Sequence, residues 1–185
     1  MQYKITPPTH IEDTILLPAS KSISNRALII HALAGGNIIP ENLSTCDDTA
    51  VIARAFKDNP YEIDIMAAGT AMRFMTAYLS VTEGEHVLTG TERMKQRPIK
   101  ILVDALRFLG ADIQYTGEEG FPPLLIKGKK LKGGSVEVAG NVSSQYVSAL
   151  LMIGPTLEKG LELKLLGNVI SRPYIDLTLN LMHEY

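Results

Sequence analysis

The segment Leu88-Thr89-Gly90 leads through a loop to Arg97-Pro98-Ile99, and the chain repeats this arrangement as Leu165-Leu166-Gly167 leading to Ser171-Arg172-Pro173-Tyr174. In both places a β-prone run ends at a glycine, and an arginine–proline pair opens a helical stretch. The two arginine–proline pairs lie 75 residues apart. A repeated strand–helix module explains this spacing.

A second echo aligns Ser22-Ile23-Ser24-Asn25-Arg26-Ala27-Leu28 with Ser144-Gln145-Tyr146-Val147-Ser148-Ala149-Leu150. Short β-prone runs alternate with amphipathic stretches, which predicts an α/β or α+β fold. Capping residues, glycines and prolines predict helices at residues 22–33, 48–57, 70–81, 98–109, 144–153 and 173–184. Strands are expected at residues 62–66, 86–89, 112–115, 124–127, 135–139 and 161–166.

Composition limits the classes of function. The 185 residues are 45% hydrophobic and 21% charged, as in globular proteins, and the net charge of −2 provides no general basic field for nucleic acid. The single cysteine, Cys46, excludes a disulfide framework and is interpreted as a small buried hydrophobe in a reducing compartment. No signal peptide and no apolar run of about 20 residues is present, so we expect a cytoplasmic protein without a membrane span.

The segment Ala19-Ser20-Lys21-Ser22-Ile23-Ser24-Asn25-Arg26 places two cations and three hydroxyls at a strand-to-helix junction. Free backbone N–H groups and the helix dipole attract anions there, and Lys21, Ser22 and Arg26 add charge and a hydroxyl. The alternative is a capped helix with solvated Lys and Arg side chains.

Four more helix starts carry polar groups. Gly69-Thr70 opens one helix, Arg97 precedes another whose first residue is expected to be Pro98, and Ser143-Ser144-Gln145 and Ser171-Arg172-Pro173-Tyr174 open two more. Each alone is most simply a turn, a solvated loop or a cap. Together they favour a shared cleft of helix N-termini that binds a multiply anionic ligand.

The sequence gives little support for metal binding or for catalysis by a Ser-His-Asp triad. The four histidines show no metal-ligand spacing, and no Ser-His-Asp order is present. Asp47-Asp48 is interpreted as a helix N-cap. The residue pattern therefore predicts no metal site.

The polar junctions together resemble the 3-phosphoshikimate 1-carboxyvinyltransferases, also called EPSP synthases. The matching motifs are Ser20-Lys21-Ser22-Ile23-Ser24-Asn25-Arg26-Ala27-Leu28, Ala68-Gly69-Thr70-Ala71-Met72-Arg73, Arg93-Met94 with Arg97-Pro98-Ile99, Val142-Ser143-Ser144-Gln145 and Arg172-Pro173-Tyr174-Ile175-Asp176. The resemblance implies two domains, each of three βαβαββ units around a pseudo-threefold axis. It implies that residues 19–185 form the N-terminal domain, incomplete at its C-terminal end, and that residues 1–18 belong with a C-terminal domain absent from this chain.

The resemblance also implies transfer of the enolpyruvyl group of phosphoenolpyruvate to the 5-hydroxyl of shikimate 3-phosphate, without metal or cofactor, by an intact protein that is a monomer. The implied shikimate 3-phosphate ligands are Lys21, Ser22, Arg26, Ser143, Ser144, Gln145, Ser171 and Tyr174. The implied phosphoenolpyruvate ligands are Lys21, Gly69, Arg97 and Gln145, with Lys21 as the catalytic residue that touches both substrates. Because the family's proton-transfer carboxylates lie in the other domain, this chain is expected to bind shikimate 3-phosphate weakly and without turnover.

Three positions depart from the family pattern. Ala19 stands where glycine is usual, Ala67 where asparagine is usual, and Phe74 where proline is usual. Two alternatives stay open. The UDP-sugar enolpyruvyl transferases share the fold, but the cysteine expected of them is absent from residues 91–96. A non-catalytic sugar-phosphate binding module would keep the same helix starts.

Overall fold

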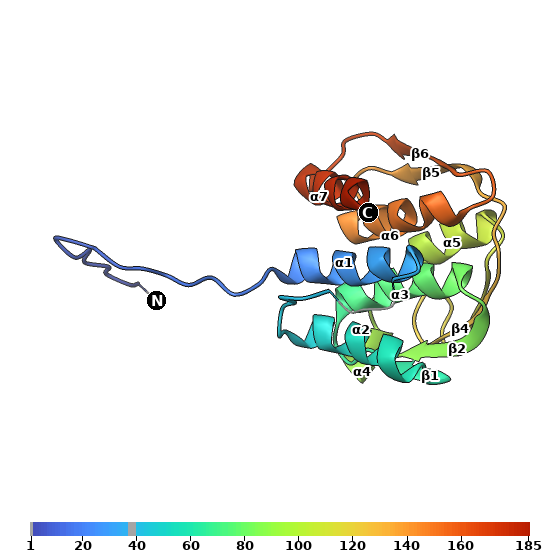
Figure 1. Ribbon diagram of the computed structural model, residues 1–185, viewed down its shortest axis with the longest axis horizontal. Helices are drawn as coiled ribbons and strands as arrows, with labels where there is room; N and C mark the ends of the chain where they lie inside the picture. Colours follow the sequence, from blue (N-terminus) through green and yellow to red (C-terminus); the bar gives the residue numbers. More distant parts are fainter. Residues whose placement is uncertain (1, 37–39) are drawn as a thin grey trace.

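A layer of helices lies between a four-stranded sheet and a two-stranded sheet (Figure 1). The computed structural model describes residues 2–36 and 40–185. The first sheet belongs to one complete βαβαββ unit, which confirms the predicted repeat and the mixed α/β class. In chain order its elements are β1 (Glu62–Asp64), α3 (Gly69–Val81), β2 (Gly84–Thr89), α4 (Glu92–Lys95), α5 (Lys100–Phe108), β3 (Asp112–Tyr115) and β4 (Leu124–Gly128).

The strand order of this sheet is β1-β2-β4-β3. β1 and β2 are parallel, because α3 carries the chain back between them, whereas β4 runs antiparallel to both β2 and β3. Ile63 pairs with Leu88 and Leu88 with Leu124, so one apolar row crosses the sheet on its buried face.

The second unit repeats the first as far as its second helix. It consists of β5 (Gly134–Ala139), α6 (Ser144–Ile153), the 3₁₀ turn η1 (Gly154–Thr156), β6 (Leu161–Leu166) and α7 (Arg172–Glu184). β5 and β6 are parallel, as β1 and β2 are. Within the described residues, no strand equivalent to β3 or β4 follows α7.

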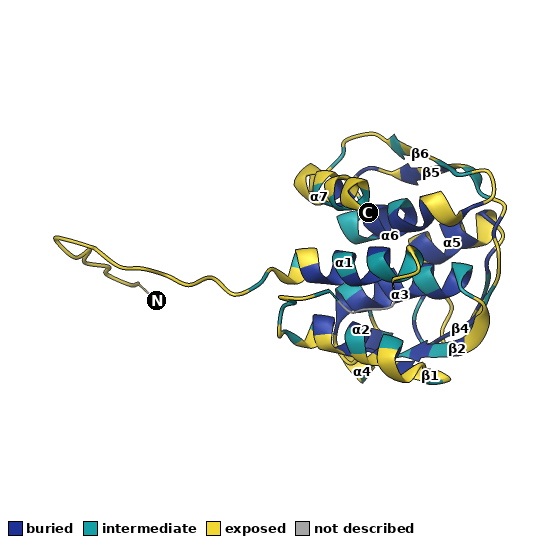
Figure 2. Cartoon of the chain, in the orientation of Figure 1, coloured by how far each residue is buried: buried dark blue, intermediate teal, exposed yellow. Residues whose placement is uncertain are grey.

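Two further helices precede these units. They are α1 (Lys21–Leu33) and α2 (Asp47–Asp58). Residues 2–18 are exposed and extend away from the body of the protein (Figures 1 and 2). The assignment of residues 1–18 to another domain stays a prediction, and residue 1 lies outside the described residues.

Residues separated by the offsets of the two sequence echoes meet in space. The Gln145 amide donates a hydrogen bond to the Thr70 hydroxyl at 3.2 Å, and these residues are 75 positions apart. The Arg26 guanidinium donates to the Ser148 hydroxyl at 2.9 Å across 122 positions, the offset of the second echo. The equivalent helices α1, α3 and α6 therefore pack against one another.

The core forms between these helices and the inner faces of the sheets (Figure 2). Phe74, Met72, Leu102, Leu106 and Ile126 are fully buried. Burial of each such side chain stabilises the fold by about 1.5–3 kcal/mol, so the helix layer is stable without disulfides.

Every predicted helix and strand begins and ends within two residues of an observed one, and the structure differs from the sequence prediction in three local details. The expected loop at residues 91–96 contains the short helix α4. The first strand ends at Asp64 rather than residue 66, because the Asp64 carboxylate accepts the Met66 N–H and Met66 turns to a φ of 54°. α5 begins at Lys100 rather than Pro98, because the Pro98 carbonyl accepts hydrogen bonds from side chains instead of from the helix.

No helix in residues 2–36 and 40–185 is long and apolar enough to cross a bilayer.

Candidate functional site

Helices α1, α3 and α6 all begin at the same end of the molecule, on the left in Figure 1. α7 joins them, because the Arg26 side chain of α1 contacts Thr178 in the middle of α7 while His31 near the end of α1 contacts the terminal Tyr185 ring. The two helices therefore run parallel. Each N-terminus presents free N–H groups and about half a positive charge. The structure thus brings the predicted helix starts together at one end.

Lys21 opens α1 and lies near the start of α2. Its Nζ is 3.7 Å from the Asp48 carboxylate, and the Lys21 side chain is half exposed. A buried hydrogen bond joins the two helices, from the Thr49 hydroxyl to the Asn25 amide oxygen, and the Ser44 N–H, just before α2, donates to the Ser24 hydroxyl. Asp48 therefore holds the Lys21 ammonium at the helix starts.

Gly69 and Arg97 are in direct contact at the start of α3. A Cβ built on Gly69 would overlap the Arg97 guanidinium, so only glycine lets this cation lie against the backbone. Arg97 forms no ion pair with any carboxylate in the described part of the chain. An unpaired guanidinium beside a helix N-terminus is suited to bind a carboxylate or phosphate.

A small cavity continues from this pair. Its volume is about 220 Å³, and it is lined by Ala67, Arg93, Met94 and Arg97. Like Arg97, Arg93 forms no ion pair with another described residue. The small side chain of Ala67 leaves this space next to two guanidinium groups, which favours an anionic occupant.

The start of α6 faces the start of α3. Ser143 caps α6 by accepting the Gln145 N–H at 3.3 Å, while the Gln145 side chain reaches Thr70. Ser144 is half-buried beside them. Gln145 is thus placed between the α3 and α6 starts.

Ser22, Ser171 and Tyr174 lie around the starts of α1 and α7. The Ser22 carbonyl accepts a hydrogen bond from Arg26, and its hydroxyl remains available. Ser171 is exposed, with a left-handed φ of 54°, and its side chain forms no capping hydrogen bond. Tyr174 is 47% exposed, so all three side chains are accessible to a ligand.

Arg26 differs from the other predicted ligands because the protein itself uses most of its donors. It is 2% exposed, and it donates to the Thr178 hydroxyl at 2.7 Å, the Ser22 carbonyl at 2.9 Å and the Ser148 hydroxyl at 2.9 Å. A longer hydrogen bond of 3.4 Å reaches the Tyr174 carbonyl. Burial lowers the pKa of Arg26 to about 10, which leaves it charged at neutral pH. The structure places this cation beneath the helix starts, where it joins α1, α6 and α7.

Two interpretations of the α2 start were wrong. Cys46, rather than an aspartate, is the N-cap residue, and Asp47 and Asp48 occupy the first turn, where they interact with the helix dipole. Cys46 is only half-buried, with its sulfur 3.3 Å from the Thr49 hydroxyl. Burial by itself raises the pKa of this thiol, but hydrogen bonds with Ser44 and Thr49 outweigh it and the pKa is lowered.

Sequence reasoning did not assign site roles to Asp48, Thr70 and Arg73. The signal for Asp48 was its charge in a predicted first turn, and Thr70 lay within a motif already quoted. Nothing in the sequence indicated that Arg73 is buried against two backbone carbonyls.

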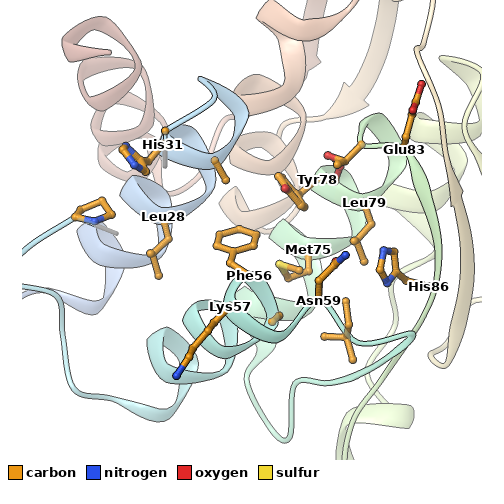
Figure 3. A pocket seen from close by; sticks show the side chains of 16 residues that line it. Leu28, His31, Phe56, Lys57, Asn59, Met75, Tyr78, Leu79, Glu83 and His86 are labelled. Carbon is orange, nitrogen blue, oxygen red and sulfur yellow. The ribbon is translucent and has the colours of Figure 1, made fainter. Parts of the chain in front are cut away.

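A second hollow, of about 490 Å³, lies at the opposite end of the helices (Figure 3). Leu28, Phe56, Met75 and Leu79 from the second halves of α1, α2 and α3 form much of its wall. Figure 3 shows the Lys57 side chain pointing away from the Phe56 ring. Helix C-termini present carbonyl groups, which disfavour an anion, although the donor-bearing side chains of His31, Asn59 and His86 also line this hollow.

Comparison with known proteins assigns the chain to a family. The family model of EPSP synthase (3-phosphoshikimate 1-carboxyvinyltransferase) matches residues 5–59 and 52–185. The chain belongs to this family. The resemblance inferred from the helix-start motifs is therefore confirmed.

Individual EPSP synthases show how much of the family fold is present. The 3-phosphoshikimate 1-carboxyvinyltransferase of Bacteroides fragilis (strain ATCC 25285) is 62% identical over 185 residues, which is all of this chain and 45% of that protein. The Mannheimia succiniciproducens protein of the same name is 43% identical over 209 aligned positions, covering 96% of this chain and 48% of the relative. A solved structure of EPSP synthase from Acinetobacter baumannii matches with a TM-score of 0.66 at 26% identity, over 77% of this chain and 38% of that one. The chain thus spans about half the length of the curated relatives it matches.

Proposed function

We propose that this chain forms the substrate-binding half of a 3-phosphoshikimate 1-carboxyvinyltransferase. The intact protein would transfer the enolpyruvyl group of phosphoenolpyruvate to the 5-hydroxyl of shikimate 3-phosphate and release phosphate. The proposal rests on family membership and on one observation above all, the contact of the unpaired Arg97 guanidinium with Gly69 at a cluster of helix N-termini.

The two anionic substrates are assigned to different parts of the cluster of helix N-termini. Gly69 and Arg97 would hold phosphoenolpyruvate, because the guanidinium and the first N–H groups of α3 meet there. Ser22, Ser143, Ser144, Ser171 and Tyr174 would hold shikimate 3-phosphate at the starts of α1, α6 and α7. Gln145 would lie between the substrates, since its side chain reaches Thr70 of α3 from the start of α6.

Lys21 would touch both substrates and act as the catalytic cation. Its ammonium lies 3.7 Å from the Asp48 carboxylate and its side chain is half exposed, so it can turn toward a ligand. Arg26 is proposed to support the shikimate 3-phosphate site from below, with one Nη1 hydrogen that forms no hydrogen bond within residues 2–36 and 40–185.

The reaction requires addition of the 5-hydroxyl to C2 of phosphoenolpyruvate with protonation of C3, followed by loss of phosphate and of a C3 proton. Helix N-termini and fixed cations stabilise the negative charge of both substrates and of the departing phosphate. Proton transfer requires an acid and a base. Asp48, the carboxylate described at the helix starts, already forms an ion pair with Lys21. The chain alone would therefore bind substrate without completing the reaction.

The proposal is tested by joining this chain to the C-terminal part of the Bacteroides fragilis relative and measuring phosphate release with both substrates. We expect turnover in the joined protein and none in the 185-residue chain. Substitution of Arg97 by alanine should abolish most of the turnover, whereas Lys129→Ala, at an exposed site without an ion pair, should preserve it. A joined, folded protein that binds shikimate 3-phosphate but releases no phosphate would favour a non-catalytic binding module.

A further inference from the structure

We propose that Arg73 is a positioning residue that fixes Arg97 against the start of α3. This inference rests on the proposed function, because it concerns the same anion site. Arg73 lies one turn into α3 and is 4% exposed. Its Nη1 donates to the Gly69 carbonyl at 3.2 Å, and its Nη2 donates to the Pro98 carbonyl at 2.8 Å.

These two carbonyls belong to the two segments that form the anion site. Gly69 is the residue against which the Arg97 guanidinium lies, and Pro98 directly follows Arg97 in the chain. One planar guanidinium therefore connects the α3 start with the backbone that carries Arg97. A lysine at this position donates hydrogen bonds from one nitrogen only and cannot hold both carbonyls in the same fixed geometry.

A second side chain completes the connection. The Tyr146 hydroxyl donates to the same Pro98 carbonyl at 2.8 Å, and the Arg73 guanidinium lies 5.8 Å from the centre of the Tyr146 ring. Tyr146 comes from α6, directly after Gln145. The Pro98 carbonyl, which would otherwise begin the hydrogen bonding of α5, is thus held from α3 and α6 together.

The charge of Arg73 has no acidic partner in the described part of the chain. Burial lowers its pKa and the nearby Arg97 lowers it further, while Tyr146 raises it. Two guanidinium groups at this junction without a carboxylate give the site a positive potential that a bound anion compensates. Arg73 therefore acts on the anion through geometry and charge without touching it.

Arg107 provides a control outside the site, because it makes similar contacts although it is exposed and Arg73 is buried. Its Nε and Nη2 both donate to the Ile113 carbonyl, at 2.9 and 2.7 Å, and its guanidinium lies 4.9 Å from the centre of the Tyr115 ring. Like Arg73, it is a helix arginine that holds a backbone carbonyl and lies over a tyrosine. Replacing it tests the loss of such a contact without disturbing the anion site.

The experiment compares Arg73→Lys with Arg107→Lys in the ¹⁵N-labelled 185-residue chain. Phosphoenolpyruvate, and inorganic phosphate as a second probe, are titrated while backbone amide and arginine Nε–H resonances are followed. We expect Arg73→Lys to weaken phosphoenolpyruvate binding at least tenfold and to shift the Arg97 Nε–H resonance in the free chain. Arg107→Lys should leave both unchanged.

Tyr146→Phe keeps the experiment decisive if Arg73→Lys does not fold, because it removes only the hydroxyl contact to Pro98 and should weaken binding about threefold. Unchanged binding and an unchanged Arg97 resonance in a folded Arg73→Lys protein would overturn the inference. If the wild-type chain shows no response to phosphoenolpyruvate, the proposed function fails at this site. The Arg97 resonance of the free variants still decides whether Arg73 positions Arg97.

Discussion

Replacing Gly69 by alanine should separate the stability of the fold from the strength of the anion site. The Gly69 φ is not positive, so alanine fits the backbone at the start of α3. The new Cβ would overlap the Arg97 guanidinium, which is the far end of a flexible side chain. We therefore expect Arg97 to move while α3 remains in place.

The two effects have opposite signs. Glycine-to-alanine substitution at a compatible site stabilises a protein by about 0.4–1 kcal/mol, because the unfolded chain loses freedom. Moving Arg97 breaks no hydrogen bond or ion pair within the described residues, so little of this gain is lost. A hydrogen bond from a charged donor to the ligand is worth about 1.5–3 kcal/mol, so its loss should raise the apparent KM for phosphoenolpyruvate roughly 10- to 150-fold.

Two measurements check this prediction. Thermal unfolding of the 185-residue chain gives the stability, and steady-state kinetics of the chain joined to the Bacteroides fragilis C-terminal part give the KM for each substrate. Gly117→Ala is the control, because its Cβ would meet only the Pro123 ring at an ordinary 3.6 Å. An unchanged KM for phosphoenolpyruvate, or an equal rise in the KM for shikimate 3-phosphate, would refute the placement of Arg97 at the phosphoenolpyruvate site.

Three further predictions concern the joined protein and the chain itself. Lys21→Ala should cost about 2–4 kcal/mol of transition-state stabilisation, as the loss of a preorganised electrostatic group does, whereas the control Lys129→Ala should cost almost nothing. Similar losses of kcat/KM in both variants would contradict the assignment of Lys21 as the catalytic cation. Thr178→Val should destabilise the chain by about 1–3 kcal/mol in urea unfolding, because the buried Arg26 Nε–H loses its acceptor, and a smaller change would show that the group finds another partner. Phe74→Pro should cost about 3 kcal/mol or more by the same assay, since residue 74 lies inside α3 with its ring under Arg26, and a stable variant would mean that α3 tolerates a kink there.

The repeated module was readable from the sequence because each unit reuses the same local signals. A β-prone run, a glycine and an arginine–proline pair occur twice; the first pair lies just before α5, and the second forms the first two residues of α7. Gly69 and Ser144 were likewise visible as helix starts, since small and capping residues mark such positions. Their convergence at one end followed from the parallel arrangement of helices in repeated strand–helix units.

Contacts between distant segments were not readable in the same way. Arg26 was expected to face a ligand, but its donors reach Ser148 and Thr178, which lie more than 120 residues away. The first residue of α5 was misplaced because the Pro98 carbonyl is held by Arg73 and Tyr146, a tertiary effect that overrides the usual preference for proline at a helix start. Local propensity predicts where a helix can begin, whereas side chains from other segments decide where it does begin.

The location of the anion site can be tested directly by titrating shikimate 3-phosphate into the ¹⁵N-labelled 185-residue chain and following its backbone amides. The account predicts saturable shifts at the helix starts, at Ser22, Ser144 and Gln145, and none in the second hollow at Phe56 and Tyr78. Shifts concentrated at the second hollow, or none at the helix starts at saturating concentration, would contradict the claim that the converging N-termini form the substrate site.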